Sequence, residues 1–143
     1  IARYLIKKGC GKSIEGAVNK YLAQCEPAYV DKYRVDCSRA IEIILDAGGI
    51  PVLAHPILLS FDKNETIDLF ALLKDMGLKG IEVYYPENPP DMTAFYIELA
   101  QRYALLKTGG TDFHGSLKPD IQMGSGRGDF AVPYEVYEKL VRI

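Results

Sequence analysis

Three short apolar runs alternate with helical segments after residue 38, and this alternation limits the possible folds more than any other feature. The runs cover residues 50–53, 80–84 and 104–108, and segments of ten or more residues with helical spacing separate them. Strands joined by connections of this length pair in parallel, with helices packed against the sheet. We therefore expect an α/β fold built on a parallel sheet.

Helix-end signals support the same division. The predicted helices cover residues 38–47, 66–76, 91–103 and 134–141, with a further short strand at 130–132. Gly48 and Gly77 follow the first two helices, as is typical of helix ends. Three or four parallel strands are too few to close a barrel. The pattern is consistent with an open sheet or with part of a barrel whose other strands lie elsewhere.

Residues 1–37 have a different character, with short helical segments and no strand alternation. A first helix is expected over residues 2–8, and Ser13 is placed to cap a second helix with one apolar face. An extended segment then carries the densest mixture of aromatic and positive side chains: Tyr29, Lys32, Tyr33 and Arg34. We therefore predict a helical subdomain at 1–37 and βα units at 38–143.

Composition excludes several classes of protein. The chain has 143 residues, 48% of them hydrophobic and 25% charged, which is typical of a globular domain. A net charge of −2 argues against binding of long nucleic acid, although a small anionic substrate is compatible with it. No apolar run approaches the roughly 18 residues of a membrane span, and no leader peptide is evident. The expected location is the cytoplasm, with no membrane partner.

Both histidines of the chain stand just after predicted strands. His55 follows the first strand, and Asp112 and His114 follow the third. On an extended backbone, residues two apart point to the same side, so the Asp112 carboxylate and the His114 imidazole can converge on one cation. A histidine before proline is also common in ordinary loops, and an aspartate after two glycines can cap a turn. Taken together, the three residues favour a metal site, with Asp112 and His114 also the candidate catalytic residues.

Other side chains near these strand ends are candidates for secondary roles. Glu82 lies on the second strand, where it supports the site or forms a structural ion pair. Residues 124–128 resemble a phosphate-binding loop, but a strand is predicted after them instead of the helix that such a loop requires. Lys118 and Arg127 are the cations nearest in sequence to the Asp112 motif, and either is suited to a phosphoryl oxygen. Tyr29 and Lys32 are the candidates for stacking on a base or contacting a phosphate.

The order and spacing of these motifs resemble the PHP (polymerase and histidinol phosphatase) family. The segments that carry the resemblance are 48–56, 80–84 and 109–115, followed by Lys118-Pro119 and Gly124. Residues 1–30 resemble the helical insertion of the nucleotide phosphatase and exoribonuclease branch. The resemblance implies part of a distorted (β/α)7 barrel and a centre of two or three divalent metal ions (manganese, iron, zinc or magnesium) that hydrolyses phosphate esters. It also implies that His55, Asp112 and His114 are metal ligands.

The chain departs from the family pattern at its beginning. Family members open with a His-x-His pair and further ligands, whereas this chain has only two histidines, and Thr111 replaces the usual serine. We therefore expect a carboxyl-terminal portion of a longer enzyme, which is inactive in isolation. The resemblance implies a small phosphorylated substrate, such as a nucleotide or a nucleoside 3′,5′-bisphosphate.

Two other functions are compatible with the residues. A metal-dependent enzyme of the amidohydrolase type would use the same ligands to break a C–N or acyl bond. A non-catalytic accessory module would bind a metal or a partner without turnover. A sheet with unpaired edges would also favour a homo-oligomer.

Overall fold

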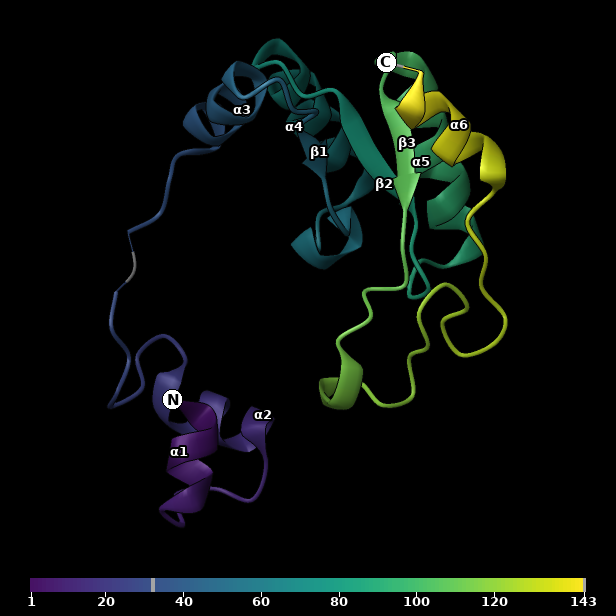
Figure 1. Ribbon diagram of the computed structural model, residues 1–143. Coiled ribbons are helices and arrows are strands. Elements are labelled where there is room, and N and C mark those ends of the chain that lie inside the picture. Colours follow the sequence, from purple (N-terminus) through teal and green to yellow (C-terminus); the bar gives the residue numbers. More distant parts are fainter. Residues whose placement is uncertain (32, 143) are drawn as a thin grey trace. The chain divides into compact units, whose positions relative to one another are not determined.

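The computed structural model describes residues 1–31 and 33–142, which form two compact units, Ile1–Val35 and Asp36–Ile143 (Figure 1). The sequence places its subdomain boundary after residue 37, close to this division. The predicted site residue Lys32 lies outside the described residues.

The first unit contains short helices. Helix α1 (Ala2–Lys7) is followed by α2 (Ile14–Ala17), which continues into the π-helical turn η1 (Val18–Leu22). The Ser13 hydroxyl accepts a hydrogen bond from the Gly16 amide at 3.0 Å, so the predicted helix cap is confirmed.

The second unit is built on a parallel sheet with the order β1-β2-β3. Its strands are β1 (Val52–Leu53), β2 (Gly80–Tyr84) and β3 (Leu106–Gly109). The parallel α/β arrangement is therefore confirmed, and the described residues form three strands of sheet. Three strands do not form a barrel, so the barrel that the family resemblance implies stays a prediction.

The predicted strand at 130–132 is wrong. The Phe130 amide donates to the Ser125 carbonyl at 3.3 Å, inside its own loop, and Pro133 has no amide hydrogen to donate. Val132 instead packs by its side chain, because its Cγ2 atom lies 3.0 Å from the position a Cβ atom would take on Gly109. The segment thus follows β3 without the hydrogen-bond ladder of a strand.

The predicted helices of the second unit all form. They are α3 (Cys37–Asp46), α4 (Lys63–Asp75), α5 (Pro90–Arg102) and α6 (Tyr134–Val141). Helix α4 begins three residues earlier than predicted. The Asp62 carboxylate accepts from the Asn64 and Glu65 amides, and the Glu65 carboxylate accepts from the Asp62 amide at 2.8 Å. This capping box fixes the start of α4.

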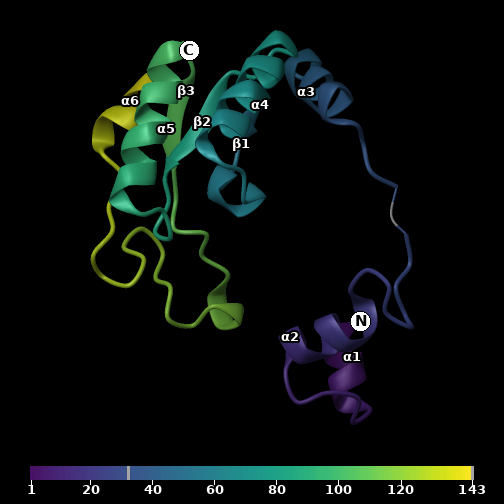
Figure 2. The ribbon, with the colours of Figure 1, turned by 180° about the vertical axis from the view of Figure 1, so that it is seen from behind.

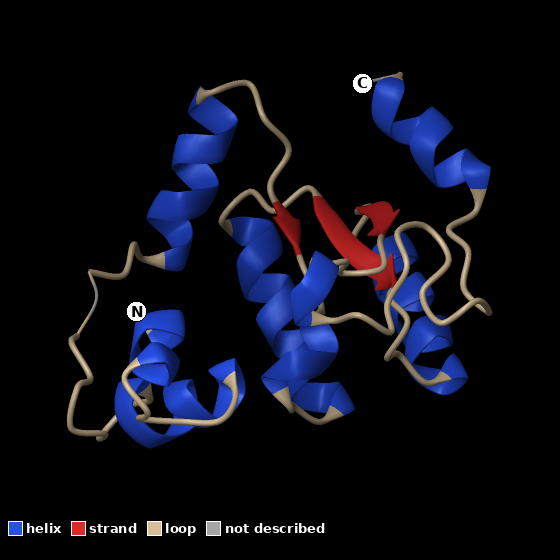
Figure 3. Ribbon diagram, turned by 60° about the horizontal axis from the view of Figure 1, so that its bottom comes forward, coloured by secondary structure: helices blue, strands red, loops and turns tan. Residues whose placement is uncertain are grey.

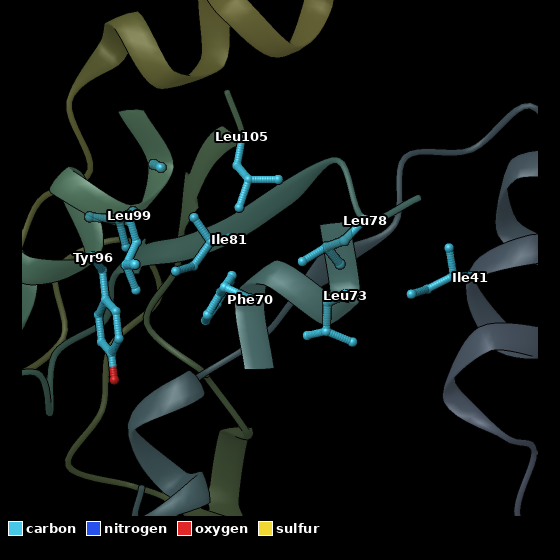
Figure 4. Packing of buried hydrophobic residues seen from close by; sticks show 10 residues of the cluster. Ile41, Phe70, Leu73, Leu78, Ile81, Tyr96, Leu99 and Leu105 are labelled. Atoms are coloured by element: carbon cyan, nitrogen blue, oxygen red, sulfur yellow. The ribbon is translucent and has the colours of Figure 1, made fainter. Parts of the chain in front are cut away.

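Helices α4 and α5 cover one face of the sheet, and α6 runs beside β3 (Figures 2 and 3). Ile81 and Val83 of β2 point into the core between sheet and helices, where both are fully buried. Their core partners include Phe70, Leu73, Leu78, Tyr96, Leu99 and Leu105 (Figure 4). Because side chains alternate along a strand, Glu82 faces away from this core.

None of the helices in the described part of the chain combines the length and the apolar character that crossing a membrane requires.

Candidate functional site

The carboxyl ends of all three strands deliver polar side chains to the same edge of the sheet. His55 follows β1 by two residues, Tyr85 comes directly after β2, and Asp112 follows β3 by three residues. In parallel sheets this edge is where loops vary freely above a rigid support, and where functional groups gather.

Glu82 holds the His55 loop in place. Its Oε2 atom accepts a hydrogen bond from the His55 backbone amide at 2.6 Å. Its Oε1 atom lies 3.7 Å from the position that a Cβ atom would take on Gly110, beyond the end of β3. The carboxylate is thus bonded to the loop after β1 and lies near the start of the loop after β3. The hydrogen bond to the His55 amide is compatible with the supporting role predicted for Glu82, which stays a prediction.

The His55 backbone is held in the left-handed region, with φ of 30°. Such values are uncommon outside glycine and often mark functional loops. The His55 ring lies 6.1 Å, centre to centre, from the ring of Tyr85, at a tilted angle of 51°. Tyr85 is almost fully buried, and burial raises the pKa of its phenol, with a further increase from the charge of Glu87. The side chain is therefore a neutral hydrogen-bond donor at neutral pH.

Asp112 and His114 lie close together, although the Asp112 backbone is left-handed, with φ of 51°, and not extended as predicted. The Asp112 Oδ1 atom lies 3.4 Å from His114 Nδ1, and the same nitrogen lies 2.7 Å from the Asp112 backbone carbonyl. A carbonyl oxygen only accepts, so this contact requires a proton on Nδ1. In the neutral imidazole, Nε2 then keeps its lone pair for a metal ion.

Lys118 occupies the other side of the Asp112 carboxylate. Its Nζ atom donates to Asp112 Oδ2 at 2.6 Å. This hydrogen bond lowers the pKa of the Asp112 carboxyl below its ordinary value, and the charges of Lys118, His114 and His55 lower it further, against the effect of burial. The same bond raises the pKa of Lys118. Both groups are therefore charged at neutral pH.

The donor atoms at these strand ends are of the kinds that bind divalent cations. Two imidazoles and one carboxylate are suitable ligands. The carboxylate of Asp112 already holds a cation, the Lys118 ammonium. Within residues 1–31 and 33–142, however, no group of three or more His, Cys, Asp or Glu side chains is gathered so that it could hold a metal. The donors are thus present on one edge of the sheet without closing around a single point.

The remaining predicted residues lie apart from this pair. Arg127 Nε donates to Asp120 Oδ2 at 3.2 Å, and both side chains are exposed. The loop around Arg127 is tied by reciprocal backbone hydrogen bonds between Gln122 and Gly126. In the first unit, Tyr29 donates to Asp31 at 3.2 Å and, with Arg34, lines a cavity of about 240 Å³.

Two features of the site were not singled out from the sequence. The first is Tyr85, the residue directly after β2. Its position after a predicted strand is the same sequence signal that identified His55 and Asp112. Tyr85 borders a cavity of about 480 Å³ that Asn88 and Phe130 also line. The contact between Lys118 and Asp112 has no sequence signal of its own, since it depends on how the intervening loop turns back.

No family model matches the chain. It is 41% identical over 81 residues to the phosphoribosyl 1,2-cyclic phosphate 1,2-diphosphodiesterase of Eggerthella lenta, covering 57% of this chain and 29% of that protein. It is 30% identical over 113 residues to the 3′,5′-nucleoside bisphosphate phosphatase of Chromobacterium violaceum, covering 79% of this chain and 40% of the relative.

The fold is also similar to a solved structure from Bifidobacterium adolescentis, described as a metal-dependent phosphoesterase. The TM-score is 0.72 at 27% identity, and the match covers 99% of this chain and 49% of the other. The chain therefore spans less than half the length of each of these three proteins.

Proposed function

We propose that this chain, which belongs to the PHP (polymerase and histidinol phosphatase) family of metal-dependent phosphoesterases, supplies part of the active site of an enzyme that hydrolyses phosphate esters. The observation that carries the proposal is that His55, Asp112 and His114 follow the carboxyl ends of β1 and β3, the two strands that flank β2 in one parallel sheet. The names of the relatives favour phosphate esters as the substrate class.

His55, Asp112 and His114 would hold the metal, which is manganese, iron, zinc or magnesium. A divalent cation polarises phosphoryl oxygens and stabilises the charge that develops as the P–O bond breaks. Glu82 fixes the backbone at His55, and the Asp112 carbonyl keeps the His114 proton on Nδ1. The protein residues therefore fix the backbone at His55 and the ring tautomer of His114.

The rest of the centre would come from elsewhere in the protein. The chain has two histidines, too few for a centre of two or three metal ions, and it spans less than half of each relative compared above. In the complete enzyme, the sheet would form the carboxyl-terminal units of a distorted (β/α)7 barrel. Residues 1–37 would be the helical insertion of that barrel.

The substrate we propose is a nucleotide or an oligonucleotide end, with a nucleoside 3′,5′-bisphosphate as the first compound to try. The similarity to the Chromobacterium violaceum phosphatase supports this choice. The cavity lined by Tyr29 and Arg34 combines an aromatic face with a positive charge, which suits a base and its phosphate. Such a substrate is consistent with a cytoplasmic enzyme, and neither a membrane nor long nucleic acid is needed as a partner.

The test compares the full-length protein with its Asp112→Asn variant. We expect the variant to lose bound metal, and phosphate release from a nucleoside 3′,5′-bisphosphate to fall at least about 100-fold, since even supporting residues of metal sites cost 10- to 100-fold. Metal content is measured by mass spectrometry and phosphate by a colorimetric assay. Asp75→Asn is the matched control, because Asp75 is an exposed carboxylate at the end of α4 and has no predicted role in the site.

Unchanged metal content and turnover in Asp112→Asn would contradict the proposal. An amide substrate panel under the same conditions tests the amidohydrolase-type reaction. Amide cleavage without phosphate release would overturn phosphoester hydrolysis as the function.

A further inference from the structure

The cavity of about 480 Å³ beside Tyr85, here called the Tyr85 cavity, lies next to the candidate site. It is formed by the loop after β2, the first turn of α5 and residues 129–131. Tyr85 is one of its lining residues, and the Tyr85 ring lies 6.1 Å from the ring of His55. Tyr85 thus borders both the cavity and the candidate site.

The walls of the Tyr85 cavity are mainly aromatic rings and prolines. They include Tyr84, Tyr85, Pro86, Pro90 and Phe130. Flat and rigid side chains of this kind suit stacking on a planar ring. The volume is also within the usual range for small-molecule sites, roughly 300–1,000 Å³. The cavity therefore has the size and the surfaces to hold a ring system.

Hydrogen bonds within the protein fix two walls of the cavity. On one wall, Asn88 Nδ2 donates to the Val83 carbonyl at 2.9 Å. On another, the Phe130 amide donates to the Ser125 carbonyl at 3.3 Å. Because these bonds hold the walls without help from a ligand, little ordering of the protein is needed when a molecule binds.

The charge of the Tyr85 cavity is negative. Asp129 lines it, whereas no lysine or arginine of the described part of the chain does. Asp129 has no ion-pair partner among the described residues, and the nearby Arg127 is paired with Asp120 instead. Asn88, which also lines the cavity, has a buried Oδ1 atom that accepts from no described residue. The cavity therefore disfavours a phosphate and favours a group with N–H donors.

We infer that the Tyr85 cavity binds the guanine base of a nucleotide substrate, with Asp129 accepting hydrogen bonds from the base and the aromatic walls stacking on it. Guanine carries two neighbouring N–H donors, N1–H and the exocyclic amine, which match the two oxygens of a carboxylate. The other bases lack this pair of donors. The inference rests on the proposed function, because it names the base of the proposed substrate. An oligonucleotide end offers a second base for the cavity lined by Tyr29 and Arg34.

The test compares guanosine and inosine 3′,5′-bisphosphates as substrates of the full-length protein, because inosine differs from guanosine only in lacking the exocyclic amine. We expect kcat/KM to be roughly 5- to 20-fold higher for the guanosine compound, since inosine loses one hydrogen bond to an exposed carboxylate. Asp129→Ala should reduce this difference to less than about 2-fold, because the acceptor is removed. Asp75→Ala, an exposed aspartate at the end of α4, is the matched control and should keep the preference.

Phe130→Ala tests the stacking separately. It should lower kcat/KM for both compounds roughly 10-fold, because stacking on an aromatic ring does not depend on the exocyclic amine. Thermal unfolding of each variant checks that the rates refer to folded protein.

Three results would overturn this inference and leave the proposed function standing: equal hydrolysis of the two compounds by the wild type, a guanosine preference that survives Asp129→Ala, or unchanged rates in Phe130→Ala. Absence of phosphate release from both compounds in the wild type would overturn the inference and the proposed function together.

Discussion

At the scale of single residues, the Glu82 carboxylate accepts the site's hydrogen bond between the residues farthest apart in the sequence. It accepts from the His55 amide, 27 positions away in the sequence, at 2.6 Å. Without this acceptor, the His55 amide in its left-handed turn would lose its hydrogen bond. The position of one candidate ligand therefore depends on a side chain from the neighbouring strand.

Replacing Glu82 should destabilise the protein and weaken the site together. We expect Glu82→Ala to lower the free energy of unfolding by about 1–3 kcal/mol, because the His55 amide loses a charged acceptor. Manganese affinity should fall about 10-fold, as for other residues that support ligands. Urea unfolding and calorimetry measure the two effects.

Glu82→Gln separates these contributions, since its amide oxygen still accepts from His55 without the charge. Glu98→Ala, an exposed glutamate on α5, serves as the control. If Glu82→Ala matched that control in both measurements, the contact would have no supporting role.

The sequence was sufficient to identify the candidate metal ligands, but not the side chains that contact them. His55, Asp112 and His114 could be named as candidates because each falls just after an apolar run. The extended backbone expected between Asp112 and His114 was wrong, since Asp112 has a left-handed φ of 51°. The ion pair of Lys118 with Asp112 could not be predicted. It depends on left-handed backbones at Asp112 and Gly115 and on the 3-10 turn over Gly115–Leu117. No single sequence motif predicts the direction that the chain takes after these features.

At the scale of elements, Gly109 of β3 leaves no room for a side chain against Tyr84 of β2. A Cβ atom on this residue would lie 2.5 Å from Tyr84 Cβ and 2.7 Å from the Tyr84 carbonyl oxygen. The pairing of Tyr84 with Gly109 follows a shift in register after Glu82. Only glycine allows the two strands to meet in this register just before the Asp112 loop.

Two neighbouring glycines provide a matched comparison. Gly109→Ala should lower the free energy of unfolding by about 1–3 kcal/mol, the usual cost of forcing extra atoms into packed structure. Gly110→Ala should change it by less than about 0.5 kcal/mol, because its nearest contact would be an ordinary 3.7 Å to Glu82 Oε1. Urea denaturation of both variants measures the difference. Equal stabilities would mean that the strands separate easily at this point.

The elements themselves were largely predictable. Strand β2 and helix α6 occur at the expected residues, and the other predicted helices differ at their ends by a few positions. Helix periodicity and helix caps depend on residues close together in the sequence, so helices can be predicted without knowledge of the fold. The prediction of a strand at 130–132 was wrong, because a strand forms only where its backbone is hydrogen-bonded to a neighbouring strand. The Phe130 amide is instead used within its own loop.

At the scale of the whole molecule, the chain brings three candidate ligands to one sheet edge but gathers no group of three His, Cys, Asp or Glu donors around a point in the residues that the structure describes. It also spans 29–49% of the three proteins compared above. A multinuclear centre therefore needs further ligands in addition to His55, Asp112 and His114.

The 143-residue chain on its own should be almost inactive. We expect kcat/KM for a nucleoside 3′,5′-bisphosphate to be at least about 1,000-fold below that of the full-length enzyme, because phosphate ester hydrolysis needs very large stabilisation of its transition state. Phosphate release at equal concentrations of the two proteins measures this ratio, and circular dichroism checks that the chain is folded. Comparable activity would mean that the described ligands suffice.

The sequence by itself determined the α/β class, the parallel direction of the strands, the helices around them and the identity of the candidate ligands. These follow from periodicity, connection length and position after apolar runs, all of which are properties of neighbouring residues. The tertiary structure alone decided the strand order, the hold of Glu82 on His55 and the contact of Lys118 with Asp112. Such contacts depend on register and chain reversal, which arise only when distant segments pack together.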